Sequence, residues 1–441
     1  QIGMQVTLVE KDSLGGTCLN RGCIPTKAYY QSAQMLRSLG QLNKFGISVT
    51  ENGFDFQTTW ERKEQIVRQL VQGIAGLLTA NGVEVIAGEA TLTSPQQVRV
   101  GDQTIETKRI LIATGSKCSH LPIPGADLPN VVNSDQLLEQ QTVPQRLTII
   151  GGGVIGLEFA SIFQTFGSQV TVLEYMPDLL SGVDKEISKR LRIFLKRQGI
   201  DIITGARVES ISDEDSQLRV TAATAKSTIT AEADTVLIAT GRRPYTANLN
   251  LEAIGVTTTP QGFIVTNADF QTNVPSIYAI GDVIGGAMLA HVASEEGRVA
   301  VERMAGLDSQ VAYHAIPAVV FTSPEVATVG LSEESAKEQG LDYRVGKFQF
   351  AANSKAVAMG ETDGLVKVLA APDGTVIGAH IVGPHAADLI AAAGLAVKER
   401  LTVEQVTTAI HAHPTLSEAW LEALLDTEKR AIHLMPKRGA Q

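Results

Sequence analysis

A unit of sequence that occurs twice constrains the fold of this chain more than any other feature. The segment Gly3–Glu10 (GMQVTLVE) is similar to Gly167–Glu174 (GSQVTVLE), and Leu111–Gly115 (LIATG) recurs unchanged as Leu237–Gly241. In the first pair of segments, an apolar, strand-like run ends in an acidic residue in both copies. The repeat predicts an α/β chain that contains two domains of one Rossmann-like type.

The second copy carries a complete dinucleotide-binding fingerprint. An apolar strand predicted over 147–150 leads into the loop GGGVIG at 151–156, an amphipathic helix follows to Phe166, and a second strand ends at Glu174. A glycine triplet alone is a weak signal, and an ordinary glycine turn is the alternative. The order of strand, loop, helix, strand and acid favours the dinucleotide site.

The residues of this fingerprint also indicate which dinucleotide binds. Gly151, Gly153 and Gly156 let backbone N–H groups and a helix N-terminus approach a pyrophosphate. Glu174 can accept hydrogen bonds from a ribose 2′-hydroxyl, and no Arg or Lys follows it before Lys185. A 2′-phosphate would meet a carboxylate and no cation, so the sequence favours NAD over NADP.

The first copy has no glycine loop within the sequence. Gly151 lies 16 residues before Gly167, so its counterpart would lie 16 residues before Gly3, ahead of the first residue. We therefore expect the chain to begin inside the first βαβ unit, without its opening strand and glycine loop.

The segment from about residue 313 onward has a different pattern. Two apolar runs, 366–369 and 375–378, flank the turn Pro372-Asp373-Gly374 and predict a β-hairpin. Ala-rich helices are expected over 385–398 and 417–425. These elements predict a C-terminal α+β domain rather than a third nucleotide-binding domain.

The length of 441 residues fits about three domains at roughly 150 residues each. We expect two nucleotide-binding domains followed by the C-terminal α+β domain. Their expected ranges are 1–145 completed by 272–312, then 146–271, and finally 313–441.

Composition excludes several classes of protein. The net charge of −10 disfavours a nucleic-acid partner, because phosphate binding needs clustered Lys and Arg. No segment approaches the roughly 18 consecutive apolar residues of a membrane span. Three cysteines are too few for a secreted disulfide framework and fit a reducing compartment, such as the cytoplasm or an organelle matrix.

Cys18 and Cys23 are the most informative pair of residues. On an ideal helix, residues five apart are rotated by about 140° net and rise about 7.5 Å, so a bridge between them needs a distorted turn. Gly22 supplies backbone freedom, and Pro25 suits the first turn of a following helix, which would place Cys23 near a helix N-terminus. Two buried, unreactive cysteines are an equal alternative on this evidence. A metal site is disfavoured because a second ligand pair is missing.

His413 and Glu418 form a second candidate pair. A carboxylate that holds one ring nitrogen of His413 would leave the other nitrogen free to accept a thiol proton. Thr415 and Glu418 also have the spacing of a helix capping box ahead of the apolar Trp420. The local sequence does not decide between these two roles, which can coexist. His291, His314, His411 and Cys118 are assigned no chemistry.

Taken together, the segments Gly15–Lys27 (GGTCLNRGCIPTK) and His413–Glu418 (HPTLSE) resemble those of the pyridine nucleotide-disulfide oxidoreductase family, class I, and the likeness covers essentially the whole chain. It implies that Cys18 is the interchange thiol and Cys23 the charge-transfer thiol beside a flavin. It also implies that His413 is a base oriented by Glu418. In the family this base acts on the disulfide of the partner subunit, so the resemblance implies an obligate homodimer.

The same resemblance implies cofactor contacts for FAD and NAD. Lys27 and Glu158 match a pair that lies beside the reactive flavin nitrogen, where buried opposite charges keep each other ionised. Glu10 would hold the adenosine ribose of FAD. The implied FAD contacts are Glu10, Gly15, Gly16, Thr17, Lys27, Thr114, Gly115 and Asp282, and those for NAD are Gly151, Gly153, Gly156, Glu174 and Gly241.

Within the family, the two motifs are most similar to members that oxidise dihydrolipoamide to lipoamide and reduce NAD. Expected partners are therefore the lipoyl groups of 2-oxoacid dehydrogenase or glycine cleavage complexes. A mercuric or glutathione-type reductase and a non-catalytic dimeric scaffold of a multienzyme complex are the alternatives. Arg21, Thr26 and Cys118 depart from the usual family residues without a physical reason that the sequence provides.

Overall fold

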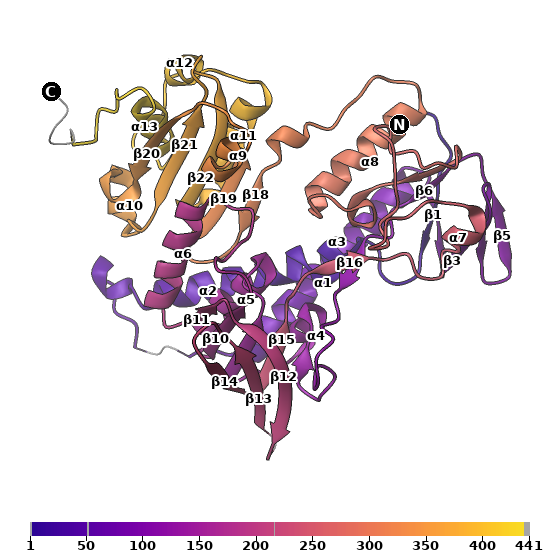
Figure 1. Cartoon of the computed structure of the whole chain (residues 1–441), viewed down its shortest axis with the longest axis horizontal. Coiled ribbons are helices and arrows are strands. Elements are labelled where there is room, and N and C mark those ends of the chain that lie inside the picture. Colours follow the sequence, from indigo (N-terminus) through magenta and orange to yellow (C-terminus); the bar gives the residue numbers. More distant parts are fainter. Residues whose placement is uncertain (1, 51–52, 216, 436–441) are drawn as a thin grey trace. The chain divides into compact units, whose positions relative to one another are not determined.

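The computed structural model describes residues 2–50, 53–215 and 217–435, and the chain divides into two compact units. Unit 1 comprises 1–122, 132–142 and 238–311, and unit 2 comprises 123–131, 143–237 and 312–441. The α/β fold expected from the sequence repeat is confirmed, and Figure 1 shows the elements of each unit. No helix among the described residues is long and apolar enough to cross a membrane.

Unit 1 contains two parallel strand pairs and an antiparallel sheet. Strand β1 (Thr7–Glu10) pairs with β2 (Glu84–Ala87), and β6 (Ile110–Ile112) pairs with β17 (Ile277–Ala279). Strands that lie far apart in sequence therefore share one core. The other strands are β3 (Ala90–Ser94), β4 (Gln97–Val100) and β5 (Gln103–Glu106), which form an antiparallel sheet, and the antiparallel pair β7 (Ser116–Cys118) and β16 (Arg242–Pro244).

Helices of unit 1 carry the cysteine motif. The 17-residue helix α2 packs against the 25-residue helix α3, and the Tyr29 and Phe56 rings lie 5.6 Å apart. The helices are α1 (Gly16–Arg21), α2 (Cys23–Leu39), α3 (Phe56–Ala80), α4 (Ser134–Glu139), α7 (Leu251–Ile254) and α8 (Ala290–Met304), with 3-10 turns η1 (Leu42–Phe45) and η2 (Gly281–Ile284).

The first part of unit 2 is a five-stranded sheet in the order β11-β10-β9-β15-β8, with β9, β10 and β11 parallel. Nearly continuous burial along β9 and β15 is typical of central strands covered on both faces. The elements are β8 (Val131–Val132), β9 (Arg146–Ile150), α5 (Val154–Thr165), β10 (Gln169–Glu174), α6 (Lys185–Arg197), β11 (Asp201–Thr204) and β15 (Thr235–Ile238), and the three-stranded antiparallel sheet is β12 (Arg207–Glu214), β13 (Gln217–Ala223) and β14 (Thr228–Ala233).

The second part of unit 2 is an antiparallel sheet in the order β18-β19-β22-β21-β20. The predicted hairpin is confirmed as β21 and β22, with Leu369 opposite Gly378, and both Ala-rich helices are present as α11 and α13. The elements are η3 (Tyr313–Ala315), β18 (Ala318–Val320), β19 (Glu325–Gly330), α9 (Glu333–Glu338), β20 (Arg344–Gln349), η4 (Phe350–Ala352), α10 (Ser354–Met359), β21 (Leu365–Ala370), β22 (Val376–Gly383), α11 (Ala386–Lys398), α12 (Val403–Thr407) and α13 (Glu418–Asp426).

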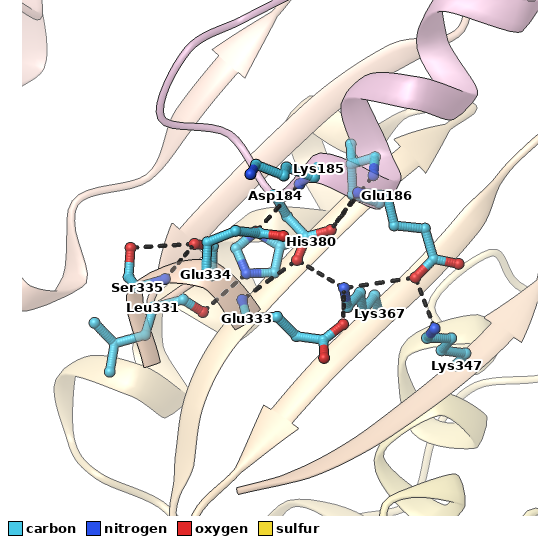
Figure 2. Close-up of polar contacts among 12 residues, drawn as sticks. Asp184, Lys185, Glu186, Leu331, Glu333, Glu334, Ser335, Lys347, Lys367 and His380 are labelled. Carbon is cyan, nitrogen blue, oxygen red and sulfur yellow. Dashed lines mark hydrogen bonds and ion pairs between the residues drawn. The ribbon is translucent and has the colours of Figure 1, made fainter. Parts of the chain in front are cut away.

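A buried ionic cluster interrupts the apolar core of unit 2 (Figure 2). The Lys367 side chain, in the middle of β21, is 1% exposed, and its Nζ lies 2.7 Å from an oxygen of Asp184, the N-cap residue of α6. Glu333 and Glu186 approach the same Nζ at 2.6 and 3.5 Å. Nearby, His380 contacts the Leu331 carbonyl through Nε2 at 2.9 Å. The cluster joins α6 to the C-terminal sheet within one unit.

Candidate functional site

The cysteine motif lies where two helices meet at a distorted turn. Helix α1 ends at Arg21, Gly22 has φ −137° and ψ −108°, and α2 begins directly at Cys23. A Cβ atom at position 22 would lie 3.1 Å from the Thr17 carbonyl oxygen, so glycine fits this break best. Pro25 lies in the first turn of α2, as predicted from its missing N–H group.

The distorted turn brings the two thiols into contact. Cys18 and Cys23 are half-buried thiols joined by a side-chain hydrogen bond. This hydrogen bond, burial and the charge of Cys23 raise the pKa of the Cys18 thiol, while the Cys23 backbone N–H and the Lys27 ammonium act in the opposite direction. The geometry that dithiol–disulfide interconversion requires is therefore present in the reduced form.

Two residues that sequence reasoning did not use hold this motif. Asn20 Nδ2 donates to the carbonyls of Leu14 and Gly16, each at 3.0 Å, and so closes the loop before α1. Thr26 Oγ1 donates to the Gly22 carbonyl at 2.7 Å, which ties the break to the first turn of α2. The spacing of Thr26 four residues after Gly22 is the only sequence signal for either contact.

The residues predicted to lie on the phosphate side of the flavin form a tight loop. Gly15 and Gly16 have φ values of 97° and 61°, in the left-handed region that favours glycine. A side chain at Gly15 would approach the Leu19 side chain to 2.7 Å, whereas the space beside Gly16 is open. Thr17 follows in the first turn of α1. Such a loop exposes backbone N–H groups to an anionic ligand.

Carboxylates stand at the carboxyl ends of both parallel strand pairs of unit 1. Glu10 ends β1, and Asp282 follows β17, which is the edge where α/β folds bind their ligands. The Asp282 carboxylate accepts a hydrogen bond from Ser116 Oγ at 2.5 Å, and Arg242 Nε donates to the same Oγ at 2.7 Å. These carboxylates and the glycine loop fit the hydroxyls and phosphates of a flavin dinucleotide.

The Ala-Thr-Gly segment connects the same region to β16. Thr114 Oγ1 donates to the Tyr245 carbonyl at 2.6 Å, and Gly115 has a φ of 67° with open space where a side chain would lie. The repeated Gly241 likewise has a positive φ, 117°. The two copies of the motif therefore share the same requirement for glycine at their turn.

The glycine loop of unit 2 has the close packing that the fingerprint predicts. A side chain at Gly156 would lie 2.0 Å from the Gly151 carbonyl oxygen, and Gly151 itself has a φ of 117°. Gly153 is the N-cap of α5 and provides no side-chain cap, so the first N–H groups of this helix are open to a phosphate. Glu174 accepts from the Gly152 N–H at 2.5 Å, at the end of β10. These residues fit the pyrophosphate and ribose of NAD.

His413 and Glu418 form the hydrogen bond that the sequence suggested. His413 Nδ1 lies 2.8 Å from Glu418 Oε1, and the other oxygen of Glu418 accepts from the Thr415 N–H at 2.9 Å. The imidazole is 71% exposed, so its Nε2 atom is accessible. Burial opposes ionisation of Glu418, but the hydrogen bonds from Thr415 and His413 outweigh it and lower the pKa of the carboxyl group.

The capping box suggested by Thr415 and Glu418 is formed only in part. Helix α13 begins at Glu418 with Ser417 as N-cap residue, and Thr415 Oγ1 donates to the Ala412 carbonyl at 2.8 Å instead of capping the helix. Only the reverse contact of a capping box, from the Thr415 N–H to Glu418, is formed. The imidazole occupies the other carboxylate oxygen, so the Glu418 side chain serves the histidine as well as the loop.

Lys27 and Glu158 belong to different compact units. Lys27 lies in α2 and acts electrostatically on Cys18, whereas Glu158 is buried in α5 and accepts a hydrogen bond from the Phe321 N–H at 2.9 Å. Their pairing beside a flavin remains a prediction. Across the described ranges, no group of three or more His, Cys, Asp and Glu residues could hold a metal ion.

Comparison with known proteins gives a consistent result along the chain. Residues 1–297 match the family described as pyridine nucleotide-disulphide oxidoreductase, and residues 316–424 match its dimerisation domain, which supports a homodimer.

The curated relatives include dihydrolipoyl dehydrogenases of Geobacillus stearothermophilus and Bacillus subtilis. They are 42% and 41% identical to this chain, and each match covers 99% of the chain and 94% of the relative.

Among solved structures, the HOCl-induced flavoprotein disulfide reductase RclA from Escherichia coli has a TM-score of 0.85 at 31% identity, covering 96% of this chain and 94% of that one. LpdA from Mycobacterium tuberculosis has a TM-score of 0.88 at 26% identity, covering 96% and 93%.

Proposed function

The chain belongs to the pyridine nucleotide-disulphide oxidoreductase family, and from this premise we propose that it oxidises dihydrolipoamide to lipoamide through Cys18 and Cys23. FAD and NAD are the cofactors of this family. The observation that carries the proposal is the contact between the two thiols at the start of α2, in a chain that is about 40% identical to dihydrolipoyl dehydrogenases over nearly its full length.

Thiol–disulfide exchange accounts for the first half of the reaction. His413 Nε2 takes a proton from one substrate thiol, and the resulting thiolate attacks the Cys18 sulfur of the Cys18–Cys23 disulfide, so that Cys23 leaves as a thiolate. The second substrate sulfur then displaces Cys18 and closes the lipoamide ring. The substrate loses two electrons and two protons, and the protein gains a dithiol.

Each polar residue has a defined part in this exchange. Glu418 holds Nδ1 of His413 protonated, which keeps Nε2 available as the proton acceptor. Lys27 lies near the Cys18 sulfur, where a positive charge favours the thiolate over the thiol. By analogy with the family, His413 acts on the disulfide of the partner subunit, so a homodimer would be needed for activity.

The second half of the reaction returns the dithiol to a disulfide. Bound FAD and NAD supply the acceptors for the two electrons. Glu10, Asp282 and the Gly15-Gly16 loop would hold the flavin, and the 151–156 loop with Glu174 would hold NAD. The proposed partners are lipoyl groups of 2-oxoacid dehydrogenase or glycine cleavage complexes, in the cytoplasm or an organelle matrix.

The test measures NADH formation from dihydrolipoamide with the full-length protein. Cys23→Ser should reduce kcat by at least about 100-fold, because the variant lacks the second sulfur and cannot form a disulfide with Cys18. Cys118→Ser is the matched control and should stay near the wild-type rate, since this third cysteine is not part of the exchange. A Cys23→Ser protein with a near-normal rate would refute the proposal.

A further inference from the structure

Helix α13 carries a second carboxylate–imidazole pair one turn beyond the first. Glu418 and Glu422 are four residues apart, and residues at this spacing lie on the same face of a helix. His433 Nδ1 lies 2.8 Å from Glu422 Oε1, the same distance that separates His413 Nδ1 from Glu418 Oε1. The same arrangement of groups therefore occurs twice along one helical face.

Glu422 is buried, although its side chain is a carboxyl group. The residue is 4% exposed, and its helix α13 packs against β20 and β21. Its second oxygen accepts hydrogen bonds from the backbone N–H groups of Ile432 and His433, at 2.9 and 3.1 Å. A buried carboxylate is stable only when its oxygens are satisfied in this way. These three contacts fasten the segment 430–435 against α13 and fix the position of the His433 ring.

The two pairs are electrostatically coupled. Burial raises the pKa of Glu418, and the hydrogen bonds from Thr415 and His413 lower it. The charge of His433 makes a smaller contribution, which also lowers the pKa of Glu418. The His433 side chain is 66% exposed, and within 2–50, 53–215 and 217–435 no hydrogen bond to its Nε2 is found. Among the neighbouring charges, Arg430 pairs with Glu428 at 2.5 Å and Glu428 with Arg344 of β20 at 3.7 Å, and exposed Lys429 adds a further positive charge.

We propose that His433, held in place by Glu422, is a positioning residue for the His413–Glu418 pair. The inference rests on the proposed role of His413 as proton acceptor. When protonated, His433 keeps Glu418 in its carboxylate form and opposes the uptake of an additional proton by the pair. Glu418 then holds the Nδ1–H tautomer of His413, and Nε2 remains free for the substrate proton. His433 therefore extends dithiol oxidation toward lower pH without contacting the substrate.

The test compares pH profiles of kcat/KM for dihydrolipoamide in matched variants of the full-length protein. His433→Asn keeps a side-chain N–H for Glu422 but removes the titratable charge. His385→Asn is the control, because this exposed histidine approaches Asp388 at 3.9 Å and has a left-handed backbone that asparagine tolerates. We expect the acid limb of the profile to move to higher pH by a few tenths of a unit in His433→Asn, and to stay in place in His385→Asn.

Two further measurements keep the inference open to refutation. In the wild-type protein, raising the ionic strength should screen the His433 charge and move the acid limb in the same direction as the substitution does. The inference is overturned if His433→Asn keeps its thermal stability and its acid limb stays in place. If that variant fails to fold, a wild-type acid limb that does not respond to salt overturns the inference instead. His413→Gln distinguishes failure of the proposed function from failure of this inference. If His413→Gln keeps its rate, the proposed function fails. If it loses about 100-fold or more while the pH profile of His433→Asn is unmoved, only the role of His433 is rejected.

Discussion

Replacing Lys367 by methionine should strongly destabilise unit 2. Lys367 is the cation that three carboxylates share inside the C-terminal sheet, and its partner Asp184 is fully buried (Figure 2). Burial disfavours the charged form of both groups, but the hydrogen bonds and opposite charges of the cluster together outweigh burial, so the pKa of Lys367 is raised and that of Asp184 is lowered. Methionine preserves the apolar part of the side chain and removes the charge.

The expected cost is about 3–5 kcal/mol, the usual effect of leaving one member of a buried ion pair without its partner. This is a large fraction of the roughly 5–15 kcal/mol that stabilises a typical folded protein. With a urea dependence of about 1–3 kcal/mol per molar, the unfolding midpoint of unit 2 should fall by roughly 1 M or more.

The assay is urea unfolding followed by tryptophan fluorescence. The chain has two tryptophans, Trp60 in unit 1 and Trp420 in the core of unit 2, so a Trp60→Phe background leaves a reporter for unit 2 alone. Lys347→Met is the matched control: this lysine also pairs with Glu186, at 2.7 Å, but is 41% exposed, so its loss should cost less than about 1 kcal/mol.

Equal midpoints for Lys367→Met and Lys347→Met would refute the reasoning, because burial would then make no difference to the value of the charge. Adding Asp184→Asn to Lys367→Met should recover part of the lost stability, since it removes a buried negative charge that has lost its partner. A double variant that is much less stable than Lys367→Met would contradict the electrostatic explanation.

Three other changes test separate parts of the structure. Burial lowers the pKa of His380 below its ordinary value of 6.5, so the unfolded chain binds a proton that the folded chain resists. The urea midpoint should therefore fall as pH drops below about 6.5, and His380→Gln should make the midpoint less dependent on pH in that range. If His380→Gln leaves the dependence of the urea midpoint on pH unchanged, another group causes the acid sensitivity. Glu174→Ala should raise KM for NAD several-fold and lower the ratio of kcat/KM for NAD to that for NADP, both measured by steady-state kinetics. An unchanged ratio would reject Glu174 as the residue that selects NAD. Gly156→Ala would place a methyl group 2.0 Å from the Gly151 carbonyl oxygen, so NAD binding measured by calorimetry should weaken by at least about tenfold, and an unaltered Kd would show that the loop relaxes freely.

Features encoded by neighbouring residues could be predicted from the sequence. The strand, glycine loop and helix at 147–166 and the hairpin around Pro372-Asp373-Gly374 follow from apolar periodicity and turn residues, and both are present. The contact between His413 and Glu418 spans five residues and was also predicted. At this range the chain has few alternative ways to satisfy the same groups.

Features that join distant segments could not be predicted. Lys367 stands between Val366 and Val368 in an apolar strand, and nothing local indicates that Asp184, 183 positions earlier, supplies its partner. The local sequence also could not decide how the Glu418 carboxylate is used, because two donors were available to it, the His413 ring and the Thr415 N–H, and the structure shows that it accepts from both. The second pair, Glu422 with His433, had one overlooked signal, the spacing of two glutamates along one helical face.

The most direct test of the proposed chemistry is thiol labelling of the oxidised, full-length protein before and after one equivalent of dihydrolipoamide is added without NAD. Exchange through Cys18 and Cys23 predicts that these two residues become alkylatable together, that Cys118 labels equally in both samples, and that added NAD reverses the gain. If lipoamide forms while the labelling of Cys18 and Cys23 stays constant, electrons leave the substrate by another route and the proposed mechanism is wrong.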